Sequence, residues 1–532
     1  MAAAPTVEDA PPTPEPFWAR SVRNTELSAP KTVVRALVLL AVVVGVALRT
    51  YTSSELWLDE ALTVNVANVG WGDLFDTLLA DGAPPLFYVL LKAWIAVFGT
   101  GNVAVRALPA MFSVATIPLA WTAGKRRGGE TVAVAALVLL ATSPFAIRYA
   151  TEARMYSLVA LLVTCGWLAV TASLERPTPV RLGAAALSAG LLVLTHYWAF
   201  HLVGVTVVAL ALGRRDRRAS QATAAAIIGG AALCFAPWVP SFLFQLERTG
   251  TPWGTPPGPI EVAFTTLVDL GGGPHPEGQA LAGILAALTV LAVFGRAVDH
   301  RRIELDLRTR PGVRADLAVG AAALLVGVGV GAATSSAWAS RYTAIAFPIV
   351  VLGAAYGVRA FADTKVRAGV LALAALLGLV GGVRNVITDR TQAPEVATAI
   401  ESTLRAGRPE SAIVVYCPDQ LGPGVSRLLP TDLPQLTFPD AVAPQLVNWI
   451  DYVDVMGQAD PHAFAADVVR RAGDERDIYF AWMPGYRGLD TKCEQVNNAL
   501  GNARSQNRQL VAPDEHTFEK HNLWLHPART TP

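Results

Sequence analysis

The sequence predicts a polytopic α-helical membrane protein that ends in a small α/β domain. Of its 532 residues, 52% are hydrophobic and only 16% are charged, and the mean hydropathy is +0.39. This apolar fraction is far above that of an average soluble domain. Membrane-length apolar runs recur up to residue 382, and shorter runs follow. The formal net charge of +1 gives no electrostatic basis for binding nucleic acid.

The N-terminal segment is expected to remain in the cytoplasm. Residues 1–30 are rich in Pro, Ala and acidic side chains, which is typical of a disordered tail. The apolar run 33–48 lies too far from the terminus for a cleavable signal peptide, so we expect a retained first span. Basic residues lie before this run and at its start. Basic segments that flank a span remain on the cytoplasmic side of the plasma (inner) membrane.

The basic loops predict the topology of the remaining chain. Between residues 31 and 390 they give about eleven spans. The run 85–98 has only ~14 residues, and we expect it to lie along the outer surface. The predicted spans are 33–48, 103–123, 131–147, 155–173, 181–195, 199–212, 223–240, 280–294, 317–333, 343–358 and 369–382. Residues 391–532 then lie outside the cytosol.

In this topology, polar residues at the ends of several spans share the outer face. Charged groups at a membrane boundary are costly unless they face water or take part in chemistry. The convergence therefore predicts one extracytoplasmic active site. Its candidate residues are Asp59, Glu60, Asp81, Arg148, Glu152, Arg154, Tyr156, His196 and Arg341.

The acidic pair Asp59 and Glu60 follows the first span and begins a patterned helix. The two carboxylates could act in catalysis, hold a divalent cation, or only cap the helix. No GxGxxG, Walker or zinc-ligand spacing carries weight in the sequence. Whether a metal takes part is left open by the residues.

Other candidates also have a simpler interpretation. If the segment after residue 148 is helical, Glu152 and Tyr156 share one face, and Glu152 could orient a neighbouring arginine. Interfacial anchoring, by contact with lipid phosphates or within an aromatic belt, is the alternative for four residues. These are Arg148, Arg154, His196 and Arg341.

The sequence beyond residue 391 predicts a separate α/β domain. Strand-length apolar runs alternate with helical patterns, which favours a mainly parallel sheet. Cys417 and Cys493 both fall in this domain, on the oxidising side of the membrane, where paired cysteines usually form a disulfide. The strands are expected at 412–416, 435–438 and 478–482, and the helices at 395–404, 462–471 and 493–503.

Four motifs occur in order: Trp57-Leu58-Asp59-Glu60, Ala83-Pro84-Pro85-Leu86-Phe87-Tyr88, Arg106-Ala107-Leu108-Pro109 and Glu152-Ala153-Arg154-Met155-Tyr156. This set resembles the GT-C superfamily of glycosyltransferases, in the branch of protein O-mannosyltransferases and lipid A aminoarabinose transferases. The resemblance covers about residues 33–197 and implies a GT-C-like fold for residues 31–390.

The resemblance also implies roles for individual residues. Asp59 matches the catalytic base and Glu60 its acidic neighbour, while Glu152 and Arg154 match a second outer-loop motif. The donor would be a sugar on a polyprenyl phosphate. The family usually has His where this chain has Ala83, so the contribution of that His does not carry over.

Chemistry agrees with such a reaction. A phosphate is a good leaving group, so one carboxylate suffices to deprotonate an acceptor hydroxyl. Arginines beside the phosphate would stabilise the charge that develops on departure. We expect a glycosyltransferase that inverts the anomeric carbon and modifies an extracytoplasmic glycan, lipid or protein of the cell envelope. A transporter or flippase, or a non-catalytic relative that binds glycans or partners, is the alternative.

Overall fold

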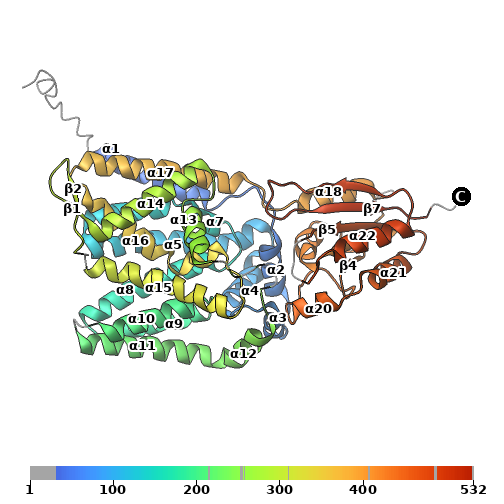
Figure 1. Ribbon diagram of the computed structural model, residues 1–532, viewed down its shortest axis with the longest axis horizontal. Coiled ribbons are helices and arrows are strands. Elements are labelled where there is room, and N and C mark those ends of the chain that lie inside the picture. Colours follow the sequence, from blue (N-terminus) through green and yellow to red (C-terminus); the bar gives the residue numbers. More distant parts are fainter. Residues whose placement is uncertain are drawn as a thin grey trace, which may run out of the picture.

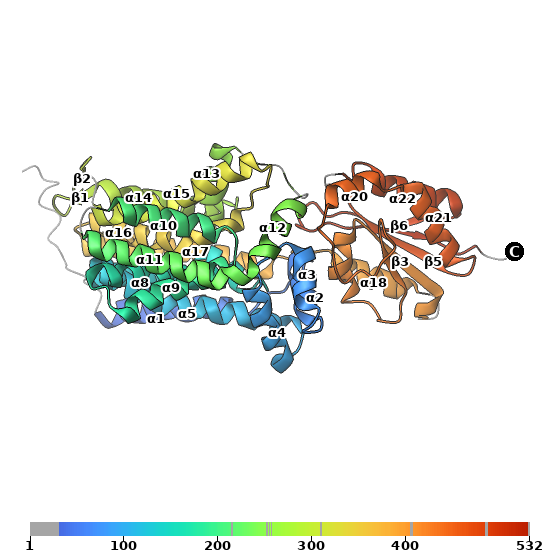
Figure 2. The same cartoon turned by 90° about the horizontal axis from the view of Figure 1, so that it is seen from below.

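The computed structural model describes residues 31–213, 216–251, 254, 256, 258–308, 311–404, 408–484 and 488–529. The predicted cytoplasmic tail, residues 1–30, lies outside this described part. The described chain forms an elongated helical bundle, and a smaller C-terminal region follows at one end of it (Figures 1 and 2). We use "C-terminal region" for residues 391–529.

The helices of the bundle mostly run along the long axis of the molecule (Figure 1). Apolar side chains such as Leu39 and Leu325, each 64% exposed, lie on its outside, as expected for a surface that faces lipid. The helices are α1 (Lys31–Leu48), α5 (Asn102–Gly128), α6 (Glu130–Ala141), α7 (Pro144–Ala150), α8 (Tyr156–Glu175), α9 (Pro179–Val193), α10 (Ala199–Leu212), α11 (Arg217–Phe235), α14 (Pro276–Phe294), α15 (Pro311–Ala333), α16 (Phe347–Gly357) and α17 (Thr364–Ile387).

Each predicted span coincides with a helix or with a pair of helices, but the helices differ in length. Among the described residues, six helices are long and apolar enough to cross a membrane, or seven if the bent pair α6 and α7 counts as one span. Apolar helices of 10–17 residues account for the other predicted spans and for the run 85–98. The chain is a multi-pass membrane protein, and the number of eleven spans remains a prediction.

A break between α6 and α7 begins the second outer-loop motif. The two helices are bent by 51°. Ser143 accepts a hydrogen bond from the Ala146 N–H at 3.2 Å, and Pro144 occupies the first turn of α7. A serine cap followed by proline is a strong helix start. The chain therefore restarts as a helix in a new direction and carries residues 148–156 to the end of the bundle.

Five further helices lie at the end of the bundle that faces the C-terminal region (Figures 1 and 2). They are α2 (Leu58–Asn68), α3 (Leu74–Asp81), α4 (Leu86–Phe98), α12 (Val239–Arg248) and α13 (Pro259–Leu270). The 3₁₀ segment η3 (Ser340–Ile345) packs against α8 and α13 nearby. Helix α2 is almost wholly buried, although Asp59 and Glu60 stand in its first turn. Acidic side chains are favourable there because they interact with the positive end of the helix dipole.

The C-terminal region contains a five-stranded sheet in the order β4-β3-β5-β7-β6. Strand β3 is parallel to β4 and β5, whereas β7 is antiparallel to β5 and β6, so the sheet is mixed rather than mainly parallel. The loop between β6 and β7 contains no helix, and antiparallel pairing needs no crossover. The elements are α18 (Ala393–Thr403), β3 (Ala412–Cys417), η7 (Asp419–Leu421), α19 (Gly422–Ser426), β4 (Gln435–Thr437), α20 (Tyr452–Gln458), α21 (Pro461–Ala472), β5 (Asp477–Trp482), α22 (Lys492–Ala503), β6 (Arg508–Val511) and β7 (Asn522–His526).

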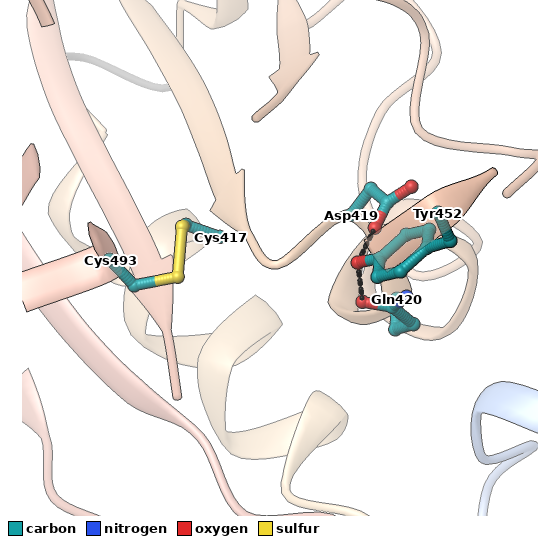
Figure 3. Close-up of a disulfide and its surroundings, with 5 residues drawn as sticks. All are labelled: Cys417, Asp419, Gln420, Tyr452 and Cys493. Carbon is teal, nitrogen blue, oxygen red and sulfur yellow. Dashed lines mark hydrogen bonds between the residues drawn. A yellow bond between two sulfur atoms is a disulfide. The ribbon is translucent and has the colours of Figure 1, made fainter. Parts of the chain in front are cut away.

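The carboxyl end of β3 faces the bundle. Cys417 closes the strand and forms a disulfide with Cys493 of α22, with a Cα–Cα distance of 5.5 Å (Figure 3). Just after it, the Tyr452 hydroxyl contacts Asp419 Oδ1 at 2.8 Å and Gln420 Oε1 at 2.9 Å. Helix α19, which follows, packs against α2. The sheet therefore meets the helix that carries the acidic pair.

Candidate active site

Asp59 faces two arginines from distant parts of the chain. Its Oδ2 lies 3.3 Å from Arg341 and 3.9 Å from Arg154. These separations exceed the 2.7–2.9 Å of strong charge-assisted hydrogen bonds. The three side chains keep 18%, 19% and 15% of their surface accessible, in the order Asp59, Arg341, Arg154. We call this group the open cluster, because its three charged side chains lie together and each keeps part of its surface accessible.

Arg154 is held in place by more than its charge. Its guanidinium donates to the Thr63 hydroxyl at 2.7 Å and to the Asp59 carbonyl at 3.4 Å. Burial alone would lower the pKa of Arg154, but the negative charge of Asp59 holds that pKa well above its ordinary value. Arg154 is therefore a fixed cation beside α2.

Glu60 has a different environment from its neighbour. Both carboxylate oxygens accept hydrogen bonds from Arg106 at 2.7 Å, and one also accepts the Ala153 N–H at 2.9 Å. The Glu60 side chain has no exposed surface. The sequence grouped Glu60 with Asp59 as catalytic, but the structure encloses it in a bidentate pair, out of reach of a substrate. Its contacts fit a positioning role.

Glu152 also belongs to an enclosed pair. Its Oε2 lies 3.4 Å from Arg390, which donates to the Thr151 hydroxyl at 3.3 Å as well. Burial raises the pKa of Glu152, and the positive charge of Arg390 opposes that shift. Residues 151–155 form bends and a turn, and α8 begins only at Tyr156, so the expected common helical face of Glu152 and Tyr156 does not exist.

Arg148 lies at the edge of the open cluster. Its guanidinium is 3.8 Å from Asp269 of α13, and the Tyr149 hydroxyl donates to the same carboxylate at 3.4 Å. With 36% of its side chain exposed, Arg148 is the most accessible of the candidate arginines. It could turn toward an anion at modest cost, since an ion pair at this distance is weak.

A row of aromatic rings lines the cluster. The ring of His196 lies 5.8 Å from Tyr156 and 5.3 Å from Tyr342. Its Nδ1 accepts the Trp198 N–H at 3.1 Å, which requires that this nitrogen carry no proton. Burial, with the charges of Arg154 and Arg341, lowers the pKa of His196 to about 3. His196 is therefore neutral, and its contacts favour packing within the row over binding of an anion.

Asp81 is placed behind the cluster. It accepts a hydrogen bond from the Tyr88 hydroxyl at 2.7 Å. Burial raises the pKa of Asp81, and the Tyr88 hydrogen bond and the charge of Arg154 oppose that shift. The helix that carries it ends at Gly82, which has a positive φ of 78° that suits glycine. Asp81 thus contributes to the field at Arg154 without a direct ion pair.

The candidate metal residues Asp59 and Glu60 each lie beside an arginine. Within the described ranges, no three His, Cys, Asp or Glu side chains are grouped so that they could hold a metal ion. Asp59 and Glu60 both face guanidinium groups instead. Cations prefer several oxygen ligands converging on one point, and here arginines occupy the positions facing the carboxylates.

Several residues at this site carried no role in the sequence interpretation. Arg106 was noticed only as part of a motif, although a lone arginine in the first turn of an apolar run signals a buried partner. Arg390 follows the last predicted span, Asp269 has no distinguishing pattern, and Trp57 belongs to the first motif but has no predicted role of its own. The Trp57 ring lies 5.8 Å from the Arg341 guanidinium and 5.2 Å from the ring of Phe518. These partners are distant in sequence, so only the fold reveals them.

Comparisons with known proteins show which family and which fold the chain resembles. A model of the family described as dolichyl-phosphate-mannose-protein mannosyltransferase matches residues 82–242, which include Arg148, Glu152, Arg154 and His196 and begin after Asp59. No curated protein sequence is significantly similar to the chain.

Solved structures share the fold over nearly the whole chain. ArnT from Cupriavidus metallidurans, bound to undecaprenyl phosphate, has 14% sequence identity and a TM-score of 0.57, over 94% of this chain and 99% of that one. The same protein in the apo state has 13% identity and a TM-score of 0.59, over 94% and 98%. The chain thus shares the fold of ArnT over nearly its whole length, and its residues 82–242 are similar to the dolichyl-phosphate-mannose-protein mannosyltransferase family.

Proposed function

We propose that this chain transfers a sugar from a polyprenyl-phosphate carrier to an acceptor hydroxyl on the extracytoplasmic side of the membrane. The observation that carries the proposal is the open cluster, where one accessible carboxylate faces two arginines at the end of a membrane bundle. The fold shared with ArnT, which was solved with undecaprenyl phosphate, supports the class of carrier. The acceptor is an envelope glycan, lipid or protein.

The cluster supplies the parts of a direct displacement. Asp59 takes the proton of the acceptor hydroxyl, whose oxygen forms a bond to the anomeric carbon. The bond from that carbon to the phosphate oxygen breaks, and the polyprenyl phosphate leaves. Arg341 and Arg154 stabilise the charge gained by the phosphate. One displacement inverts the anomeric carbon, and no strong acid is needed for a phosphate leaving group.

The long distances between Asp59 and its two arginines suit a reaction in which these arginines leave the carboxylate and bind a phosphate. At 3.3 and 3.9 Å, Arg341 and Arg154 attract the carboxylate without locking it. An arriving phosphate would form shorter bonds with the same guanidinium groups, which bind phosphate well because their donors are forked and planar. Asp59 would then be released toward the acceptor. Arg148, paired with Asp269 at 3.8 Å, is available as a third phosphate ligand.

The distribution of basic residues supports the orientation. The basic loops lie at the end of the bundle away from the C-terminal region; strands β1 (Gly295–Ala297) and β2 (Ile303–Leu305) mark this end (Figures 1 and 2). Arg126 pairs with Glu175 and Arg127 with Asp316 at the same end. Since basic loops stay cytoplasmic, we assign residues 1–30 to the cytoplasm, residues 31–390 to a membrane catalytic domain and residues 391–532 to an extracytoplasmic domain.

A groove offers a path for the acceptor. It encloses about 840 Å³ between α4, the start of α5 and α19. Glu55 and Leu56 form part of its wall and precede Asp59 by only a few residues. Aromatic rings, here Trp94 and Phe98, beside an acid and Arg427 provide both stacking and hydrogen-bonding surfaces. We assign this groove to a hydroxyl-bearing acceptor.

Replacement of Asp59 by Asn in the producing cell tests the proposal. We expect polyprenyl-phosphate sugars to accumulate several-fold and one envelope glycan sugar to disappear, since loss of a general base slows transfer by about 10²–10⁴-fold. Mass spectrometry of extracted lipids and hydrolysed envelope measures both. The matched control is Asp76→Asn, which removes an exposed carboxylate from the neighbouring helix α3.

Unchanged lipids and glycans in the Asp59→Asn strain, at normal protein level, would contradict catalysis and favour a transporter or a non-catalytic binding role. Accumulation of the carrier-linked sugar in the Asp76→Asn strain as well would show that the effect does not depend on the open cluster.

A further inference from the structure

Helix α2 is capped by a residue from the other end of the chain. Its own N-cap residue, Trp57, makes no side-chain capping bond. Instead the Leu58 N–H donates to Glu519 Oε1 at 3.0 Å. A carboxylate at a helix N-terminus satisfies a free N–H and interacts favourably with the helix dipole. The first turn that Glu519 caps contains Asp59.

Glu519 is itself held by backbone bonds to the segment that links the bundle to the C-terminal region. The Glu519 N–H donates to the Arg390 carbonyl at 2.8 Å, and the Gln392 N–H donates to the Glu519 carbonyl at 3.1 Å. Arg390 in turn binds the Ser54 hydroxyl through its N–H at 2.9 Å and Glu152 through its side chain. Glu519 is therefore hydrogen-bonded to a segment, residues 390–392, that also contacts the segment before α2.

The residue before Glu519 reaches the open cluster by a second route. The ring of Phe518 contacts Trp57 edge-on at 5.2 Å, and Trp57 lies 5.8 Å from the Arg341 guanidinium. Arg341 faces Asp59 at 3.3 Å. Edge-on aromatic and cation–π contacts of this kind each contribute to orientation. Two adjacent residues of the C-terminal region thus contact Trp57 and Leu58, the two residues that precede Asp59.

We propose that Glu519 is a positioning residue, whose carboxylate caps α2 and fixes Asp59 opposite Arg341 and Arg154, so that the C-terminal region completes the active site. This inference rests on the function proposed above for Asp59. Glu519 is 7% exposed and does not touch the open cluster itself, so it acts through α2. Burial raises the pKa of Glu519 to about 7, with Leu58 and Thr391 opposing that shift and Asp59 and Glu60 adding to it.

The variants Glu519→Ala and Glu519→Gln separate capping from general stability. Gln keeps an acceptor oxygen for the Leu58 N–H, whereas Ala removes it. The matched control is Glu515→Gln, an exposed position in the same loop that pairs with Lys520. Each full-length variant is purified in lipid nanodiscs and is also expressed as the cell's only copy.

We expect three measurements to respond differently to these variants. Amide exchange in the peptide spanning residues 57–62 rises about tenfold or more in Glu519→Ala, rises less in Glu519→Gln, and stays unchanged in Glu515→Gln. Envelope transfer, measured as in the Asp59→Asn strain, falls at least tenfold in Glu519→Ala and recovers largely in Glu519→Gln. Affinity for added undecaprenyl phosphate stays within about twofold of wild type, because Arg341 and Arg154 remain.

Unchanged amide exchange in Glu519→Ala would overturn the inference. Normal transfer by Glu519→Ala would also overturn it if the Asp59→Asn strain has lost transfer. Loss of carrier affinity together with transfer would also overturn it, since that pattern indicates general collapse. If Asp59→Asn itself has no effect, the proposed function fails, and the exchange measurement still decides whether Glu519 caps α2.

Discussion

Asp59 and Glu60 are neighbours in sequence and on one helix turn, yet they have opposite surroundings. Glu60 is fully enclosed, with two 2.7 Å hydrogen bonds from one arginine. Asp59 is 18% exposed, and its two arginines stand at 3.3 and 3.9 Å. A closed pair with every bond made has little left to offer a substrate. The proposed function needs an acid whose arginine partners are also accessible to a phosphate, and the longer distances and partial exposure at Asp59 are consistent with that need.

The buried acid–arginine pairs and the open cluster are expected to have different roles. The two buried pairs, Glu60–Arg106 and Glu152–Arg390, connect the segment before α2, the loop after α7 and the segment that leads into the C-terminal region. The open cluster lies on the frame that these pairs hold. Catalytic groups must be fixed within a fraction of an ångström by their supporting residues. The enclosed acids are therefore expected to affect folding, and the accessible acid to affect chemistry.

The largest effect is expected from breaking a closed pair. Glu60→Gln leaves Arg106 buried without its counter-charge, and removal of one partner of a buried pair typically costs about 3–5 kcal/mol. Asp59→Asn should change stability by less than about 1 kcal/mol, because loose, partly exposed pairs contribute little. The apparent melting temperature of the full chain in detergent distinguishes the two. Equal losses would remove the distinction between closed and open acids.

A double variant serves as the control for this test. Glu60→Gln combined with Arg106→Met removes both charges, so most of the lost stability should return. If the double variant is as unstable as Glu60→Gln alone, the loss comes from packing and not from the unpaired guanidinium.

The next largest effect is expected within the open cluster. Arg341→Gln and Arg154→Gln should each weaken binding of undecaprenyl phosphate about 10- to 100-fold, since a hydrogen bond to a charged group is worth about 1.5–3 kcal/mol. Thermophoresis of purified protein with added undecaprenyl phosphate measures the affinity. Arg126→Gln, at the other end of the bundle beside Glu175, should leave it unchanged. An equal loss in all three variants would mean that binding does not use the cluster.

Much of the fold follows from local sequence patterns. Apolar runs predicted the positions of the bundle helices, and alternation predicted β3, β4 and β5. The sequence does not predict the last two strands: β6 is largely exposed and begins Arg508-Gln509, and β7 is a short segment that begins and ends with the polar residues Asn522 and His526. Their antiparallel pairing depends on the neighbouring β5, a contact that no local pattern records.

The site was predictable as a set of residues but not as a set of pairs. The basic loops predict that Asp59, Arg154 and Arg341 share one side of the membrane, and this prediction is what groups them. No local sequence pattern shows that Glu60 pairs with Arg106, or that Glu519 accepts a hydrogen bond from Leu58, which is 461 positions away in the sequence. Such pairings depend on how helices pack, and two adjacent acids look alike until the packing separates them.

Asp419 gives the smallest expected effect in this comparison: it is a buried acid whose side chain contacts Tyr452, and it pairs with no arginine among the described residues. Burial raises its pKa to about 7, while hydrogen bonds from Tyr452 and the backbone oppose the shift and Asp440 adds to it. Because the folded pKa exceeds the ordinary 3.8, the folded state binds the proton more tightly, and stability falls as pH rises from about 4 toward 7. Asp419→Asn keeps an acceptor for Tyr452 but cannot ionise. Between pH 5.5 and 8, the melting temperature of Asp419→Asn should therefore fall by a few degrees less than the melting temperature of the wild type. Identical dependence on pH in the two proteins would show that the Asp419 carboxyl does not titrate in this range.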